Sequence, residues 1–474
     1  MAVSIGKDTF IVCRNSQGIE VRATLLRLTR FSVVFEVYNP YSILQLSEVL
    51  SDFKIVMNDR MVYSGRAIVS NLVNTGIMLM CEASLEDSWL DADFFSPLNR
   101  AGNIESEFVD FLKEWAKVQL VAPEFKVIIA DIQTLLTDLR RWLEQVEFGI
   151  RSNPNEDRAK MEKDVVDKLK KPMLPMVTDL FGKFELLASQ LAEDQQPIYR
   201  AYGRRLLHPL VLCAPFVFRT FQKPLGYAGD YEMVNMILRD PYEGGSLFAK
   251  VVNYYFWNQA PAEAHRNRVH KLADYLATET QRVVSQGRTA KIFNLGCGPA
   301  KEVQEFLSGY DICEKADFTL LDFNDETLSY TQRELESLKV RHRRRTPIQL
   351  VKRSVNQILK ETFKTSMDGP LAQKYDLVYC AGLFDYLSDR ICQRLIDIFY
   401  EMLVPGGMLV ATNVSSSNPA RQLMEYFMEW HLVYRNVDQV KSMAPKSACP
   451  DLVRVQSDST GVNLFLEVRK PENG

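Results

Sequence analysis

Short apolar stretches, one of which alternates with polar neighbours, recur over residues 1–98, and a helical period replaces them after that. Val21, Ala23 and Leu25 alternate with polar neighbours, and Ser32–Tyr38 is a short run rich in apolar residues. Alternation with a period of two is typical of strands that bury one face. Further strands are expected at Lys54–Met57, Met61–Tyr63, Ala67–Val69 and Gly76–Cys81. Many short strands at close spacing predict a small β-barrel over residues 1–98.

Residues 103–200 follow the helical period instead. Apolar residues recur there at spacings of four and three, at Ile128, Ile132, Leu135, Leu139, Trp142 and Val146. This heptad stripe indicates either a helical bundle packed on itself or a coiled coil that joins two copies of the chain. We expect a helical middle region, with a homodimer through it as one of the two outcomes.

Residues 286–474 contain apolar runs that are typical of buried strands. The expected strands are Lys291–Leu295, Asp317–Leu321, Ile348–Val351, Tyr375–Ala381 and Leu403–Ala411. The first of them breaks into the turn Gly296-Cys297-Gly298, and a helix is expected from about Lys301. Because glycine has no Cβ, the backbone can turn sharply here and a ligand can lie against it.

An acidic residue at the end of the second strand narrows the choice of ligand. Asp322 follows Gly296 by 26 residues, and a carboxylate in this place holds the ribose hydroxyls of a bound nucleoside. A dinucleotide site would need a third glycine where Lys301 stands, and no Walker loop follows the strand. Because the turn is not built for a pyrophosphate, S-adenosylmethionine (SAM) is the better ligand.

The turn and the later strands resemble the class I SAM-dependent methyltransferases, as does the turn Val404-Pro405-Gly406-Gly407 that leads from a helix into a strand. The resemblance implies an α/β, Rossmann-like methyltransferase domain over residues 286–474, with SAM as its cofactor. It implies that the cofactor is contacted by the turn after the first expected strand and by the residues that follow the second, third and fourth expected strands. These residues are Asn294, Gly296, Cys297, Gly298, Asp322, Asn324, Ser354, Val355, Asn356, Ala381, Gly382 and Asp385.

Composition sets limits on the rest of the interpretation. The chain has 474 residues, 46% of them hydrophobic, and a net charge of −3, which indicates several domains and argues against a nucleic-acid partner. Its eight cysteines include no C-x-x-C pair and no spacing typical of a metal site, which suits a reducing compartment. The chain begins without a basic and apolar signal segment, and no apolar run is long enough for a bilayer. We therefore expect a cytoplasmic protein without a metal ion and without stable membrane insertion.

A segment in front of the methyltransferase-like region is rich in glycine and tyrosine. Lys223–Met233 contains two glycines, which allow close approach to another surface, together with Tyr227, Asp230 and Tyr231. A structural turn uses the same chemistry, but this density of polar aromatic residues is more typical of a lid. We expect residues 201–285 to form a helical cap over the active site.

Two arginines of the same region are candidates for binding an acid group. Arg266 and Arg268 lie near the start of an expected helix, where anions are favoured and guanidinium groups add paired donors. A pair of surface salt bridges would explain them equally well.

The stretches Pro224–Met233, Ala262–Arg268 and Trp430–Arg435 resemble one methyltransferase subgroup. That subgroup makes methyl esters of 3-hydroxy fatty acids, such as 3-hydroxypalmitic acid methyl ester, an autoinducer of plant-associated bacteria. The resemblance implies that the acceptor is the carboxylate of a small or lipid-like acid.

A carboxylate acceptor must be oriented but needs no base, whereas a hydroxyl or an amine usually needs proton removal. The candidate catalytic residues are Tyr227, Tyr231, Arg266, Arg268, His431 and Arg435. His431 is the candidate base, although a histidine beside Trp430 in a helix is more typical of packing. Two alternatives stay open: a methyltransferase for a hydroxyl, an amine or a protein side chain, and a SAM-sensing scaffold.

The N-terminal barrel resembles PilZ domains, which often bind cyclic di-GMP. At the best-fitting place, Arg27–Ser32, the aspartate of the family's D-x-S-x-x-G turn is replaced by Arg27 and its final glycine by Ser32. We expect a structural or docking role for this PilZ-like domain. The basic run Arg341–Arg345 lacks interleaved aromatic residues, so we interpret it as a solvated loop and not as a nucleic-acid contact.

Overall fold

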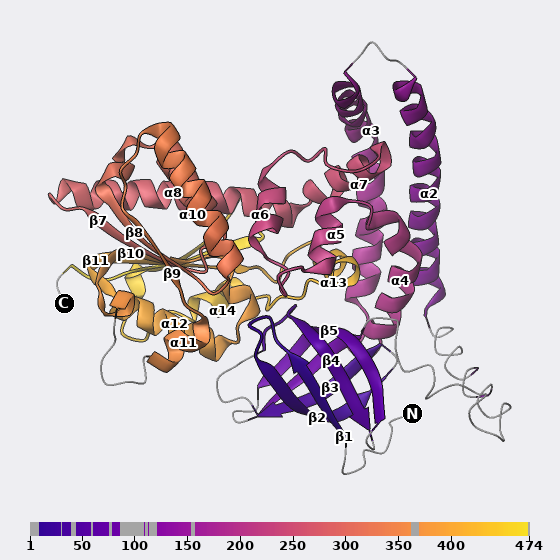
Figure 1. The fold of residues 1–474 in the computed structure, drawn as a ribbon, viewed down its shortest axis with the longest axis horizontal. Helices are drawn as coiled ribbons and strands as arrows, with labels where there is room; N and C mark the ends of the chain where they lie inside the picture. The colour runs from indigo at the N-terminus through magenta and orange to yellow at the C-terminus, as the bar shows by residue number, and fades with distance from the viewer. Residues whose placement is uncertain are drawn as a thin grey trace. The chain divides into compact units, whose positions relative to one another are not determined.

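The chain forms two compact units in the computed structural model, whose secondary structure is drawn in Figure 1. Unit 1 comprises Met1–Ala228, Arg239–Gln259 and Pro419–His431, and unit 2 comprises Gly229–Leu238, Ala260–Asn418 and Leu432–Gly474. The structure describes residues 9–29, 31–38, 44–57, 60–74, 78–85, 109, 112, 121–152, 157–361 and 369–472.

Unit 1 begins with a closed barrel of six antiparallel strands in the order β1-β2-β3-β6-β5-β4. The strands are β1 (Thr9–Arg14), β2 (Glu20–Leu28), β3 (Ser32–Tyr38), β4 (Val49–Met57), β5 (Arg60–Asn74) and β6 (Met78–Leu85). Val21, Ala23 and Leu25 of β2 are buried while their neighbours are exposed, as the pleat of a strand requires. The barrel expected from the alternating pattern is therefore confirmed.

The strands differ from the expectation at β5 and at β1. The expected strands Met61–Tyr63 and Ala67–Val69 are parts of the single strand β5, and β1 was not expected at all. Gly65 lies between the two expected strands and pairs with Phe53 of β4, next to a shift of register. The ladder therefore continues through the glycine, and the β-bulge beside it has its extra residue in β4.

The other described elements of unit 1 are helices. They are α2 (Pro123–Arg151), α3 (Arg158–Ser189), α4 (Gln196–Val211), α5 (Pro215–Gln222), α7 (Leu247–Trp257) and α13 (Arg421–Phe427). Helix α2 packs against α3, α4 and α7, which is the bundle outcome of the heptad pattern. Of the expected helical segment, residues 103–108, 110–111, 113–120 and 153–156 lie outside the described residues.

The prediction that the heptad stripe forms the buried face of α2 is only partly correct. Ile128 and Ile132 are buried, whereas Trp142 is 47% exposed. The buried face of α2 passes instead through Leu136 and Leu143, because a straight helix drifts away from a strict seven-residue repeat. A homodimer through this region stays a prediction.

Unit 2 is built on a sheet of seven strands in the order β12-β13-β11-β10-β7-β8-β9. The strands are β7 (Ala290–Leu295), β8 (Ala316–Asp322), β9 (Ile348–Lys352), β10 (Tyr375–Cys380), β11 (Leu403–Val414), β12 (Val453–Ser457) and β13 (Asn463–Arg469). Strands β7 to β11 are parallel, and β13 runs antiparallel to both of its neighbours. The five strands expected from the apolar runs are all present.

The strand order fixes where a ligand can bind. The chain runs outward from β7 through β8 to β9, and then returns to place β10 on the other side of β7. The switch point of the sheet therefore lies between β7 and β10. In open α/β sheets, ligands bind outside the carboxyl ends of the strands at such a point.

Helices cover both faces of this sheet, as Figure 1 shows. They are α8 (Ala260–Ser285), α9 (Lys301–Gly309) and α10 (Asp325–His342) on one face, and α11 (Val355–Glu361), α12 (Asp389–Glu401) and α14 (Val437–Lys441) on the other. Helix α6 (Tyr231–Leu238) packs on α8. Short 3-10 turns are η2 (Asp311–Lys315), η3 (Gly369–Ala372), η4 (Phe384–Tyr386) and η5 (Pro450–Leu452).

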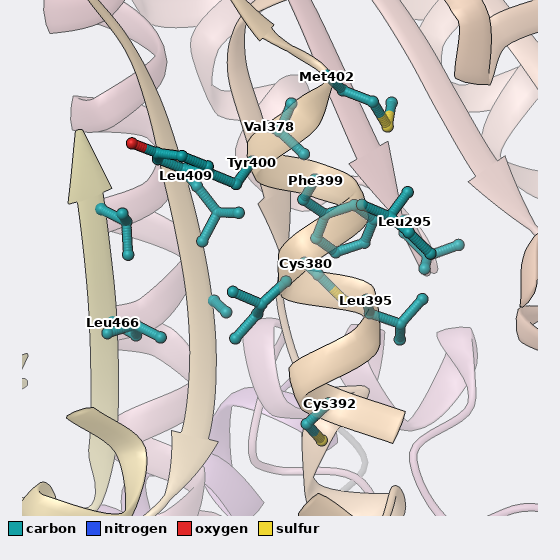
Figure 2. Close-up of a cluster of buried hydrophobic side chains, with 14 of the residues drawn as sticks. Leu295, Val378, Cys380, Cys392, Leu395, Phe399, Tyr400, Met402, Leu409 and Leu466 are labelled. Carbon is teal, nitrogen blue, oxygen red and sulfur yellow. The ribbon is translucent and has the colours of Figure 1, made fainter. Parts of the chain in front are cut away.

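Each face of the sheet has its own apolar core. Ile292 of β7 packs with residues of α8 and α9, and its neighbour Phe293 packs on the opposite face. The ring centroids of Phe293 and Phe399 of α12 are 6.1 Å apart. Figure 2 shows Leu395 and Phe399 of α12 together with Val378 of β10. Strands β7, β8, β10 and β11 are thus buried on both sides, whereas the edge strand β9 has no fully buried residue.

The compact units do not follow the segment boundaries expected at 200 and 285. Of residues 201–285, Gly229–Leu238 and Ala260–Ser285 belong to unit 2 and the remainder to unit 1. The segment Pro419–His431 also belongs to unit 1, because α13 packs against α3 and α4. The cap role of residues 201–285 stays a prediction. None of the described helices is long and apolar enough to cross a membrane.

Candidate functional site

The turn after β7 has a backbone that few side chains tolerate. Gly296, Gly298 and Ala300 have φ angles of 74°, 49° and 48°, all in the left-handed region that favours glycine. The amides of Gly296 and Cys297 donate to the carbonyl oxygen of Leu321 at 2.8 and 2.9 Å. A Cβ built on Gly298 would meet no atom within 4 Å apart from its chain neighbours, so space lies beside this backbone.

Asp322, at the end of β8, is tied to this turn as the sequence spacing suggested. Its carboxylate accepts the N–H of Gly298 at 3.1 Å and that of Asn324 at 3.0 Å. Burial raises the pKa of Asp322, and the N–H groups that it accepts oppose that rise by stabilising the charged form. The structure therefore brings together the glycine turn and the acidic side chain, although it gives the carboxylate a second task in shaping the turn.

Other predicted cofactor residues have structural contacts of their own. Asn324 caps α10 by accepting the N–H of Thr327 at 2.9 Å. Ser354 accepts the N–H of Gln357 at 3.3 Å, and it lies with Val355 and Asn356 directly after β9 in half-buried positions. These contacts fix the ends of the helices that follow β8 and β9.

The loop after β10 holds the next group of predicted residues. Gly382 has a φ of 77° and donates its N–H to the Thr412 hydroxyl at 3.1 Å. The buried side chain of Asp385 accepts the N–H of Val414 at 2.5 Å, and its backbone oxygen accepts that of Val433 at 2.7 Å. Asp385 therefore anchors the end of β11, and Gly382 beside half-buried Ala381 remains next to the switch point.

Asn294 lies in β7 immediately before the turn. Its Nδ2 donates to the backbone oxygen of Tyr379 at 3.4 Å, and its buried Oδ1 has no hydrogen-bond partner among the described residues. A buried acceptor without a partner is costly. Asn294 thus retains capacity to accept a hydrogen bond at the switch point.

Arg268 is the predicted clamp residue whose surroundings best fit ligand binding. It is 7% exposed, it extends from α8 toward Gly382, and its Nη1 finds no hydrogen-bond partner within the described part of the chain. Arg266, two residues earlier, points elsewhere and donates to the backbone oxygen of Ile237 at 3.4 Å.

Arg435 is engaged in holding the fold together. Its guanidinium donates to Asp389 at 2.8 Å and to the backbone oxygens of Phe384 and Leu387 at 3.0 and 2.7 Å, and it also bonds Asn413. These contacts satisfy the fork of donors and fix the loop after β10. The prediction that Arg435 clamps an acceptor does not fit this geometry.

Tyr231 begins α6 and contacts α10. Its hydroxyl donates to Glu326 at 2.8 Å, and its ring stacks on that of Tyr330 with centroids 4.6 Å apart. Asp230 caps α6 by accepting the N–H of Met233 at 2.8 Å. A Cβ built on Gly229 would lie 2.9 Å from the Tyr386 hydroxyl. Within unit 2, Gly229–Leu238 therefore contacts both the loop after β10 and the helix after β8.

Two predicted catalytic residues, Tyr227 and His431, belong to unit 1. His431 was expected in a helix, but it lies after the end of α13. Its Nδ1 is 3.7 Å from Glu425, and its backbone N–H and C=O form hydrogen bonds with the Ser47 hydroxyl. Burial lowers the pKa of His431 to about 4. These contacts agree with the packing interpretation of this histidine.

Sequence reasoning missed three residues around the turn. Glu302, in the first turn of α9, is buried and accepts the hydroxyl of Tyr379 at 2.8 Å. Thr331 of α10 donates its hydroxyl to the backbone oxygen of Gly298 at 2.7 Å. Only the position of Glu302, directly after the glycine turn, offered a signal. Among the described residues, no cluster of His, Cys, Asp and Glu side chains could hold a metal ion.

Comparison with known proteins gives matches only among solved structures. No protein-family model matches the chain, and no curated protein does. A protein of Bordetella parapertussis described as a possible exported protein is 17% identical, covering 74% of this chain and 99% of its own, with a TM-score of 0.41. Magnesium protoporphyrin IX methyltransferase of Synechocystis PCC 6803 with bound SAH is 11% identical, covering 54% and 98%, with a TM-score of 0.35. N-methyltransferase NodS of Bradyrhizobium japonicum WM9 is 15% identical, covering 44% and 98%, with a TM-score of 0.28.

These TM-scores lie below 0.5, so the assignment of the fold rests on strand order. The sheet of unit 2 is parallel from β7 to β11, has an antiparallel strand next to one edge, and reverses its strand order between β7 and β10. Unit 2 therefore has an open α/β fold with helices on both faces of the sheet.

Proposed function

We propose that this chain is an enzyme that transfers a methyl group from SAM to an acceptor. One observation carries the proposal: the glycine turn after β7 and the carboxylate of Asp322 after β8 are joined by a 3.1 Å hydrogen bond. Both lie at the carboxyl ends of adjacent parallel strands. Nucleoside ligands of open α/β sheets bind at this place.

The residues at this place fit SAM. Gly298 leaves space beside its backbone, and the oxygens of Asp322 can accept hydrogen bonds from ribose hydroxyls. Asn356 follows β9, where an amide side chain can pair with adenine. When bound, SAM supplies a methyl group on a cationic sulfur. The chain has to hold that group and the acceptor in line, because orientation supplies much of the rate.

We further propose a carboxylic acid as the acceptor, with 3-hydroxy fatty acids as the first candidates. The subgroup resemblance supports this choice, and an anionic acceptor needs no general base. Of the clamp residues that the sequence offered, Tyr231 and Arg435 have other partners in the structure. The choice of acceptor therefore rests on the subgroup resemblance and not on a clamp residue.

A transfer assay tests the proposal. The protein is incubated with methyl-labelled SAM and a series of 3-hydroxy fatty acids of different chain length, and label in the organic phase is counted. Mild alkali hydrolyses methyl esters but leaves methyl ethers and methylamines intact. We expect label that is transferred by the wild-type protein, released by alkali, and strongly reduced with Asp322→Ala.

Other outcomes separate the alternatives. Label that resists alkali, or that stays in protein, identifies a hydroxyl, amine or protein acceptor in place of the acid. Tight SAM binding without any transfer to host acids or proteins identifies a SAM-sensing scaffold. In that case the barrel β1–β6 would be the docking module.

A further inference from the structure

Unit 2 buries a guanidinium group without satisfying it. Arg268 is 7% exposed, and its Nη1 has no hydrogen-bond partner among the described residues. Glu302 and Asp385 are near enough to stabilise its charge, but within the described part of the chain neither forms an ion pair with it. A buried charge without hydrogen bonds is costly unless a ligand supplies the acceptor.

The surroundings of Arg268 place its charge at the switch point of the sheet. A Cβ built on Gly382 would lie 3.1 Å from both Nη1 and Nη2, so the guanidinium lies directly against the backbone after β10. Gly382 is itself held by its 3.1 Å hydrogen bond to the Thr412 hydroxyl. Arg268 therefore extends from α8 to the carboxyl end of β10, next to the turn of β7.

Glu302 supplies the opposite charge from the other side of the switch point. It is the second residue of α9, directly after the glycine turn, and it is 8% exposed. Its Oε1 accepts the hydroxyl of Tyr379 at 2.8 Å. A carboxylate can accept more than this one side-chain hydrogen bond, so Glu302 has room for a charged donor.

We propose that Arg268 and Glu302 bind the methionine end of SAM, Arg268 taking its carboxylate and Glu302 its ammonium group. A ligand group that carries both charges neutralises both buried side chains. An acid acceptor carries a carboxylate but no ammonium, so it would match Arg268 alone. This inference rests on the proposed function, since it requires SAM as the ligand.

Two ligands that differ only at the amino-acid end provide the test. S-adenosylhomocysteine (SAH) carries the carboxylate and the ammonium, whereas 5′-methylthioadenosine keeps the nucleoside and the sulfur but lacks both. Their affinities are measured by calorimetry for the wild-type chain, Arg268→Gln and Glu302→Gln. Lys271→Gln is the matched control, because it removes a cation from the same helix, α8. The Nζ of Lys271 donates to Gln456 and not to the switch point.

We expect Arg268→Gln and Glu302→Gln each to weaken SAH binding at least tenfold while changing the affinity for 5′-methylthioadenosine less than twofold. The control variant should bind both ligands as the wild-type chain does. Thermal unfolding of each variant is recorded alongside.

Three results would overturn the inference. Unchanged SAH affinity in Arg268→Gln, together with a raised KM for an acid acceptor, would assign Arg268 to the acceptor. Equal losses for both ligands with a lowered Tm would make Arg268 and Glu302 structural. A wild-type chain that binds neither ligand would refute the proposed function itself. This result differs from a failure of the inference alone, in which the wild-type chain binds SAH and the variants bind it equally well.

Discussion

Replacing Asp322 by alanine should weaken SAM binding by at least about 1.5 kcal/mol, which is more than tenfold in Kd. The carboxylate accepts the N–H groups of Gly298 and Asn324 at 3.1 and 3.0 Å, and we assign it the ribose hydroxyls as well. A hydrogen bond to a charged acceptor contributes roughly 1.5–3 kcal/mol. The loss of one such bond to ribose sets the lower bound, and loosening of the turn adds to it.

The same substitution should lower the free energy of unfolding of unit 2 by about 1–3 kcal/mol, because two backbone N–H groups lose their acceptor. Denaturant unfolding measures this, and calorimetry with SAH measures the loss of affinity. Asp325→Ala is the control, since that exposed carboxylate pairs with Lys352 and belongs to α10. An Asp322→Ala protein that is folded and binds SAH with wild-type affinity would refute the ribose assignment.

Three further predictions concern other parts of the chain. The barrel should not bind cyclic di-GMP tightly, because Arg27 and Ser32 replace the aspartate and the glycine of the D-x-S-x-x-G turn of PilZ domains. Micromolar or better affinity in equilibrium dialysis would contradict this. Gly382→Ala should cost about 1–2 kcal/mol in the free energy of unfolding of unit 2, measured with denaturant, because φ is 77° and a Cβ would crowd Arg268. Burial raises the pKa of Glu48 from 4.5 to about 7, so the folded barrel keeps a proton that the unfolded chain has lost. The free energy of unfolding of the barrel should therefore fall by roughly 3 kcal/mol between pH 4.5 and 7. In the Glu48→Gln variant, denaturant unfolding over the same pH range should not show this fall.

The local parts of the candidate site could be predicted from the sequence. A strand, a glycine turn and a helix are neighbours in the chain, so Lys291–Leu295 and Gly296–Gly298 indicated their own structure. Asp322 could be added because parallel strands bring their carboxyl ends to one edge of the sheet. Its hydrogen bond to Gly298 confirms that the two meet.

The roles of the arginines could not be predicted in this way. Arg266 and Arg268 are two residues apart on one helix, and only the packing of α8 decides which of them is buried against the sheet. Arg435 ends the stretch Trp430–Arg435 that resembles the methyltransferase subgroup, but Asp389 and the backbone of η4 accept hydrogen bonds from its guanidinium. These partners lie 46 and 51 residues away, beyond the reach of any local pattern.

The division of the chain into units also depends on distant contacts. Pro419–His431 lies between β11 and β12 in the sequence but belongs to unit 1. The N–H groups that begin α13 are accepted by Glu185 of α3 at 2.9 and 2.6 Å. A part-buried polar contact of this kind between segments more than two hundred residues apart leaves no trace in composition or periodicity.

Transfer of a labelled methyl group to an acid tests the central claim most directly. In separate reactions, the wild-type chain is incubated with SAM that carries a deuterated methyl group and with either 3-hydroxy fatty acids or an extract of host metabolites and proteins. The products are analysed by mass spectrometry. We predict a methyl ester that carries the deuterium and that mild alkali converts back to the free acid. If SAH binds tightly while no acid, other host metabolite or protein gains the deuterated methyl group, the chain is not a methyltransferase.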